Sequence, residues 1–144
     1  MFSGSRVNFT RAVFSGGVVV FRTARFSGGT VDFTWATFSD GLVLFNPARF
    51  EGGTVDFGDT TYSGGRVDFG RATFSDGMVH FNTARFAGGR VHFTGATFSD
   101  AAVQFHLATF SQGTVDFSEA VGRAPAGLLT SQPVPAGLTL APGW

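Results

Sequence analysis

Three histidines are the residues of this chain whose type and spacing come closest to a metal or acid–base site. His80 and His92 lie twelve residues apart, each directly before a phenylalanine, whereas His106 directly follows one. A zinc site takes three or four His, Cys, Asp or Glu ligands that the fold brings together. The chain contains no cysteine, and no carboxylate stands at ligand spacing beside these histidines. We therefore expect solvated surface histidines that hold no metal and no cofactor.

A second group with the right chemistry is formed by Asp40, Asp76 and Asp100, which share one position after a Phe-Ser pair. Paired carboxylates can act as general acid and base, but an aspartate at a chain corner more often caps the turn with its own side chain. The sequence specifies no Ser-His-Asp arrangement. Its Gly-Gly pairs precede apolar runs and do not open helices, as phosphate-binding loops do. We expect a protein that is not an enzyme and has no small-molecule substrate.

The composition favours one small folded domain. Of the 144 residues, 43% are apolar and 14% are charged, so the chain can bury a core. Ten arginines balance ten acidic residues and lysine is absent, which predicts no nucleic-acid partner. No apolar run reaches the length of a membrane span, and the first residues do not resemble a signal peptide. A cytoplasmic protein without membrane association is expected.

The elements that position these side chains are set by a repeat that uses every phenylalanine. The spacing between successive aromatic residues alternates between seven and five, with Tyr62 in the one position that lacks phenylalanine. The unit has twelve residues, F-S-G-G-x-V-x-F-x-x-A-x, and recurs ten times from Phe2 to Val121 without insertion. A fixed period of this kind indicates structural units that stack on one another.

Each unit contains two short extended segments, of the types V-x-F and A-x-F. Alternation along a strand places both apolar side chains of such a segment on one face. The pattern holds throughout, with Thr60 as the one exception in the alanine column. The links between segments are short and often contain glycine, which is typical of tight corners. Because a single unit cannot bury its apolar face, the units must stack with backbone hydrogen bonds between coils. The sequence therefore predicts an all-β fold, a β-solenoid.

Segments such as A-T-F-S-D, A-R-F-E-G and V-D-F-G-D resemble the pentapeptide-repeat family. Its unit is a small residue, a variable polar residue, a central Leu or Phe, and two corner residues. The resemblance covers Phe2 to Val121 and implies a right-handed quadrilateral β-helix, with the first and third residues of each unit inward. The sequence departs from the family pattern because every second unit has seven residues, through two additional positions before the valine. It is a variant with alternating five- and seven-residue units.

Two coil sizes are open. A twelve-residue coil would enclose two phenylalanines, one valine and one alanine in a layer about 4.8 Å thick, for which the lumen is too small. A coil of about 24 residues keeps four corners and four large inward residues, and we expect this size, with five coils in all. Against it, the larger coil places Asp32 over Asp56 and Arg25 over Arg49, which are like charges on adjacent strands.

Outward positions must carry any recognition, because the inward ones are committed to packing. In a 24-residue coil, Val18 and Val20 lie beside Leu42 and Leu44 on the same side of adjacent layers. Monomers rarely expose such a cluster, so we expect an interaction patch there, with tolerated surface aliphatics as the alternative. The equivalent positions of the second half are more polar: Met78, His80, Ala102 and Gln104.

The repeat divides the chain into a solenoid, residues 1–121, and a Pro- and Gly-rich C-terminal tail, residues 122–144. The tail either is flexible or caps the last coil and protects its strand edge. The apolar residues available for capping are Leu128, Leu129, Leu138, Leu140 and Trp144. The first unit starts at Phe2, so the N-terminal coil is a second expected contact, suited to end-to-end dimerisation.

The features together favour a non-catalytic structural or protein-interaction scaffold that binds a protein partner or itself, as a homodimer. The alternative comes from the resemblance, which implies inhibition or protection of a type II topoisomerase such as DNA gyrase by imitation of DNA. Such mimicry needs a broad acidic face, whereas the arginines of this chain are scattered among its acids.

Overall fold

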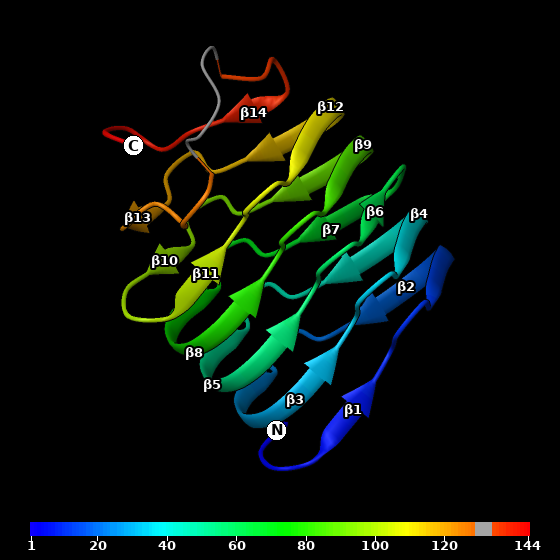
Figure 1. The fold of residues 1–144 in the computed structure, drawn as a ribbon, viewed down its shortest axis with the longest axis vertical. Helices are drawn as coiled ribbons and strands as arrows, with labels where there is room; N and C mark the ends of the chain where they lie inside the picture. Colours follow the sequence, from blue (N-terminus) through cyan, green and yellow to red (C-terminus); the bar gives the residue numbers. More distant parts are fainter. Residues whose placement is uncertain (129–133) are drawn as a thin grey trace.

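The described chain is built from β-strands that run parallel to one another in two sheets (Figure 1). The computed structural model describes residues 1–128 and 134–144. One sheet contains β1 (Arg6–Asn8), β3 (Arg25–Asp32), β5 (Arg49–Asp56), β8 (Thr73–His80), β10 (Thr97–Phe98), β11 (Ala102–Gln104) and β13 (Val121–Gly122). The other contains β2 (Val13–Val20), β4 (Thr37–Leu44), β6 (Thr61–Tyr62), β7 (Arg66–Asp68), β9 (Arg85–His92), β12 (Thr109–Asp116) and β14 (Leu138–Thr139). Within these described residues, no helix could cross a membrane.

Residues 24 positions apart lie side by side on adjacent strands. Phe14 of β2 pairs in register with Phe38 of β4, and Val31 of β3 pairs with Val55 of β5. The same offset continues to the pairing of β10 with β13, apart from shifts at the strand bends. The chain is therefore a β-solenoid of about five coils with 24 residues per coil, as predicted. The twelve-residue coil is wrong.

Aromatic rings fill the lumen of the solenoid. The fully buried ring of Phe69 stacks on those of Phe45 and Phe93, with centroids 4.7 and 4.8 Å apart. It also meets Phe57 and Phe81 edge-on, at 5.6 and 5.7 Å with interplanar angles of 87° and 82°. Rings 24 residues apart thus stack along the axis, whereas rings twelve residues apart face each other across the lumen. This arrangement explains why the larger coil accommodates all the inward phenylalanines.

The eight-residue strands bend at their glycines, where the backbones of successive coils touch. At the bend in β5, Gly53 has a φ of 66°. A Cβ on this residue would lie 2.5 Å from the carbonyl oxygen of Gly29 and 2.6 Å from the carbonyl carbon of Gly28, both in the preceding coil. The position needs glycine both for its left-handed backbone and for the lack of space.

The two-residue links between the segments form turns with a left-handed second residue, even where that residue is not glycine. Trp35, Asp59 and Arg71 have φ values of 63°, 55° and 58°. In the first of these turns, the amide of Ala36 donates a hydrogen bond of 3.0 Å to the carbonyl of Phe33. The strain of a non-glycine residue in this region is of order 1–2 kcal/mol, and it is offset because the closure of every coil requires the same turn.

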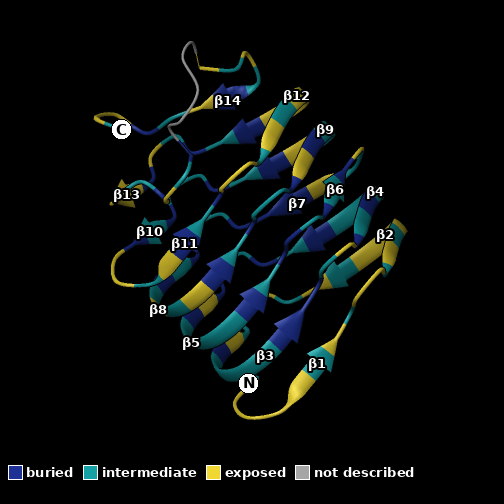
Figure 2. Ribbon diagram, viewed as in Figure 1, coloured by how far each residue is buried: buried dark blue, intermediate teal, exposed yellow. Residues whose placement is uncertain are grey.

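The N-terminal coil leaves part of the core uncovered. Figure 2 shows β1 and much of β2 as exposed, in contrast to the buried interior of the coils that follow. Phe9, Phe14 and Phe21 are only partly buried, whereas their stacking partners in the next coil are fully buried. The first coil therefore presents aromatic side chains together with the edges of both sheets.

The C-terminal segment lies against the last coil. β14 pairs with β12, and the ring of Trp144 packs on Phe98 and Phe117 with centroids 5.7 and 5.4 Å away. The indole Nε1 of Trp144 donates a hydrogen bond of 3.1 Å to the carbonyl of Gly122. Leu129, one of the tail residues considered above, lies outside the described residues.

Candidate interaction surface

The structure brings together the four outward aliphatic residues that the sequence suggested as an interaction patch. Val18 of β2 pairs in register with Leu42 of β4, and Val20 pairs with Leu44. Val18 and Val20 are 62% and 58% exposed, and the two leucines are half-buried. We call these four residues the lateral patch. It lies on the side wall of the first two coils, outside the aromatic lumen.

The lateral patch ends abruptly at the third coil. Leu42 is followed along its column by Arg66, and Leu44 by Asp68. These two charged side chains form an ion pair with a separation of 2.8 Å between guanidinium nitrogen and carboxylate oxygen. In the fourth coil the same columns continue with Arg90 and His92. One wall of the solenoid therefore changes from aliphatic to charged between two adjacent strands.

The matching wall of the other sheet is polar. Met78 and Ala102 are register partners, as are His80 and Gln104. The side-chain oxygen of Gln104 lies 3.0 Å from Nδ1 of His80 and accepts a hydrogen bond of 3.1 Å from the amide nitrogen of Asn82. These side chains satisfy one another, so this wall presents hydrogen-bonding groups and lacks an aliphatic cluster.

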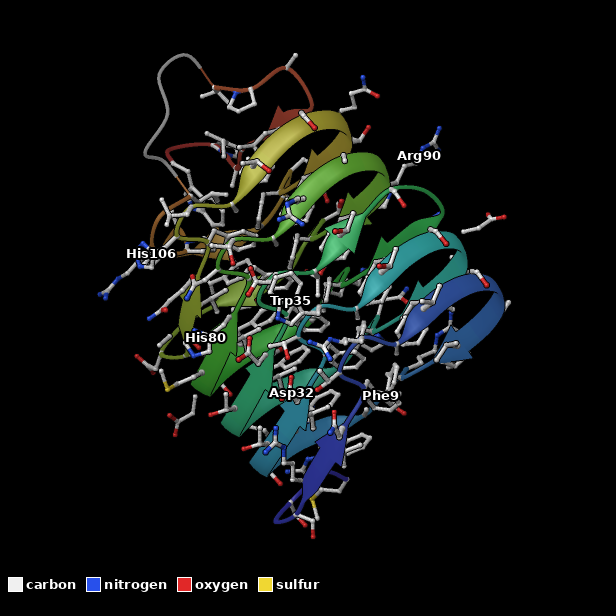
Figure 3. The ribbon with its side chains drawn as sticks, turned by 45° about the vertical axis from the view of Figure 1, so that its right-hand side comes forward. Phe9, Asp32, Trp35, His80, Arg90 and His106 are labelled. Carbon is white, nitrogen blue, oxygen red and sulfur yellow. The ribbon has the colours of Figure 1, made fainter. Side chains whose placement is uncertain are left out.

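The histidines do not form a common site. His80 is on β8 and His92 on β9, which belong to different sheets. His80 and His106 project from one side of the coils and Arg90 from the opposite side (Figure 3). Burial lowers the pKa of His92, and the guanidinium of Arg66 lowers it further. Within residues 1–128 and 134–144, no group of three or more His, Asp or Glu side chains could hold a metal ion.

The recurring aspartates occupy strand bends. The carboxylates of Asp40 and Asp76 accept hydrogen bonds of 2.8 Å from the amides of Gly41 and Gly77. Their side chains thus stabilise the left-handed glycine that follows each of them. This is the turn-capping role that the sequence favoured over paired-carboxylate chemistry.

A different aspartate, Asp32, has the most distinctive electrostatic environment. Burial alone would raise its pKa, but the hydroxyl and backbone amide of Thr34 and the guanidinium of Arg6 donate to the carboxylate and hold the pKa below its usual range. Arg6 reaches it from the preceding coil at 2.9 Å. These bonds compensate for the predicted stacking of Asp32 on Asp56, which the strand register shows.

Sequence reasoning missed an arginine cluster on one edge of the solenoid. Arg25 and Arg49 are register partners on β3 and β5, as the 24-residue coil requires. Arg71 belongs to the nearby turn column and lines one hollow together with both of them. The signal was present in the spacing, but the stacked arginines counted only as an unfavourable like-charge contact.

The coil period, the parallel strands and the repeating aromatic columns define this chain as a β-solenoid of pentapeptide-repeat-like architecture. No protein-family model matches the sequence, and no curated protein matches it.

Proposed function

We propose that the protein is a non-catalytic scaffold, a variant of the pentapeptide-repeat family, that associates with a second copy of itself through the lateral patch. The observation that carries the proposal is the change in side-chain character along one outward column. Val18 and Leu42 give way to Arg66 and Arg90 on strands of the same geometry. The coil therefore does not need aliphatic residues at these positions. Clustered outward aliphatics that serve no internal packing are typical of a surface that a partner covers.

A second copy of the chain suits this patch. The formal net charge is zero at neutral pH, so two copies do not repel each other. A twofold axis can place the valines of one copy against the leucines of the other, which makes the patch self-complementary. The patch also adjoins the edge of its sheet, because β2 is the terminal strand in the described sheet order. Edge strands favour pairing with another chain.

The expected affinity is moderate. Fully burying a valine or leucine side chain gains roughly 1.5–3 kcal/mol, and association itself costs on the order of 4–15 kcal/mol. With four partly exposed side chains from each copy, the balance supports a dissociation constant on the order of micromolar.

Replacing Leu42 and Leu44 together with aspartate is expected to abolish self-association, because carboxylates cannot be buried against aliphatic side chains without a large desolvation cost. Light scattering coupled to size-exclusion chromatography, over a concentration series, measures the change from dimer to monomer. Met78→Asp is the matched control, because Met78 is an exposed apolar residue in the equivalent column of the other sheet. The control should remain dimeric.

Two results would count against the lateral patch. A wild-type protein that is monomeric at all concentrations removes the second copy as the occupant. A dimer that survives the double aspartate substitution, and is lost instead on Val13→Asp, points to end-to-end contact. Val13 is 65% exposed on β2 of the first coil and lies outside the patch. Val18→Asp serves as a second test if the double variant fails to fold.

Imitation of DNA is less well supported. The outward aspartates Asp32 and Asp68 are each paired with an arginine. An arginine cluster also lines one edge of the solenoid. A gyrase supercoiling assay with added protein is expected to show no effect, because a DNA mimic needs a continuous negative face.

A further inference from the structure

The arginine cluster surrounds a hollow on the outer surface. The hollow has a volume of about 350 Å³ and is lined by Thr23, Arg25, Pro47, Arg49, Arg71 and Thr73. Three successive coils contribute, because Arg49 lies between Arg25 and Thr73 in the strand register. Adjacent coils are spaced by about 4.8 Å, so the guanidinium groups can converge on a ligand a few ångströms across.

The positive charge of this hollow is only partly neutralised. Nε of Arg25 donates to the carboxylate of Glu51 at 2.6 Å. In the part of the chain that the structure describes, the side chains of Arg49 and Arg71 have no hydrogen-bond or ion-pair partner. Three guanidinium groups and one carboxylate leave two positive charges uncompensated. The nearest other carboxylate on the neighbouring strand, Asp76, is the register partner of Glu51 and does not line the hollow.

The hydrogen-bonding groups of the hollow are donors. A guanidinium presents five N–H donors in a planar fork that matches the oxygens of a phosphate group, and even Arg25 keeps donors beyond its Nε. The hydroxyl of Thr73 has no side-chain partner among the described residues and can donate as well. The Thr23 hydroxyl already donates to the carbonyl of Arg22 at 2.6 Å.

We propose that this hollow binds a phosphate dianion, held by the guanidinium groups of Arg25, Arg49 and Arg71. A dianion matches the two uncompensated charges, whereas a single carboxylate leaves one. The ligand is compact, because the turn column continues beyond Arg71 with Gly95, and the strand column continues beyond Thr73 with Thr97. An extended polyanion would therefore find no further arginines along this edge.

A second hollow provides room for an organic group attached to the phosphate. It has a volume of about 600 Å³ and shares Pro47 and Arg71 with the first. Its lining includes Asp68 and Thr94, which can contact hydroxyl groups. Free phosphate and a small phosphate monoester therefore share the chemistry of the first hollow and differ in their use of the second.

Isothermal titration calorimetry on the full chain tests this site, with inorganic phosphate and with glycerol 3-phosphate at pH 8 and low ionic strength. Arg49→Gln and Arg71→Gln should each weaken binding of either ligand about tenfold or more, because each removes charge-assisted hydrogen bonds. Arg85→Gln is the matched control. Arg85 occupies the position equivalent to Arg49 on the other sheet, but its register partners are Thr61 and Thr109. The control should bind within about twofold of wild type, since no bonds to the ligand are lost.

The outcomes separate the alternatives. Loss on Arg49→Gln with tighter binding of glycerol 3-phosphate identifies a monoester ligand, and the same loss with equal or tighter binding of inorganic phosphate identifies the free ion. Absence of binding by the wild-type protein overturns the site. Equal weakening by Arg85→Gln also overturns it, because the attraction would then be nonspecific. Arg49→Lys, which keeps the charge but loses the fork, should bind more weakly than wild type and more tightly than Arg49→Gln.

Discussion

Replacing Phe69 with alanine is expected to lower the free energy of unfolding by about 3–5 kcal/mol. The ring is fully buried, stacks on Phe45 and Phe93, and meets rings across the lumen. The cavity left by alanine cannot close, because each surrounding ring is fixed in its own stack. Coils in a solenoid contact only their neighbours, so a defect in a central coil weakens the interfaces on both sides.

Chemical denaturation followed by circular dichroism measures this loss. Phe2→Ala is the control, because Phe2 lies in the first coil, is only partly buried, and stacks on one side only, on Phe26 at 4.8 Å. The control should lose about 1–2 kcal/mol, in proportion to its smaller burial. Equal losses for the two variants would contradict a core in which the central rings are enclosed by stacked neighbours.

Replacing Gly53 with alanine is the second substitution with a large expected effect, a loss of about 3 kcal/mol or more. Two separate causes add. The left-handed backbone, with a φ of 66°, costs a non-glycine residue about 1–2 kcal/mol. The new Cβ would also lie 2.5 Å from the Gly29 carbonyl oxygen, and forcing the two coils apart costs about 1–3 kcal/mol more.

Gly17→Ala separates these two causes. Gly17 has the equivalent bend position in β2 and a φ of 71°, but a Cβ there meets nothing within 4 Å. Its loss should be limited to the backbone cost, about 1–2 kcal/mol. Thermal and denaturant unfolding of both variants gives the difference. If Gly17→Ala were as destabilising as Gly53→Ala, contact between successive coils would not limit this column to glycine.

The coil could be predicted because a single sequence regularity carries both its local and its long-range structure. The V-x-F and A-x-F alternation gives strands, and the volume of the inward phenylalanines excludes a twelve-residue coil. The structure shows the physical reason in Phe57 and Phe69, which are twelve residues apart and meet edge-on across one lumen. Two such rings cannot also be stacked in adjacent layers.

The turn conformations could not be read from residue types. Trp35 and Asp59 adopt left-handed backbone angles that their own propensities disfavour, particularly for tryptophan. The coil imposes them, since the amide of Trp35 donates to the carbonyl of Gly58 in the next coil at 3.1 Å. Tertiary closure therefore overrides local preference at these positions.

The two candidate surfaces differ in how far the sequence reveals them. The lateral patch follows from column arithmetic alone, because Val18 and Leu42 are outward residues 24 positions apart. The phosphate hollow requires knowledge of which outward columns lie side by side around a bend. Arg71 is in a turn column and Arg49 in a strand column, and only the folded coil shows that both line one space.

The central claim is that the chain winds with 24 residues per coil, so that only its outside is available for recognition. Nuclear Overhauser effects from the ring protons of Phe14, labelled at that site alone, test it most directly. We expect contacts to the ring of Phe38, whose centroid lies 4.8 Å away in a stacked arrangement. Contacts from Phe14 to Phe26 at stacking distance, with none to Phe38, would contradict the 24-residue coil and both surfaces inferred from it.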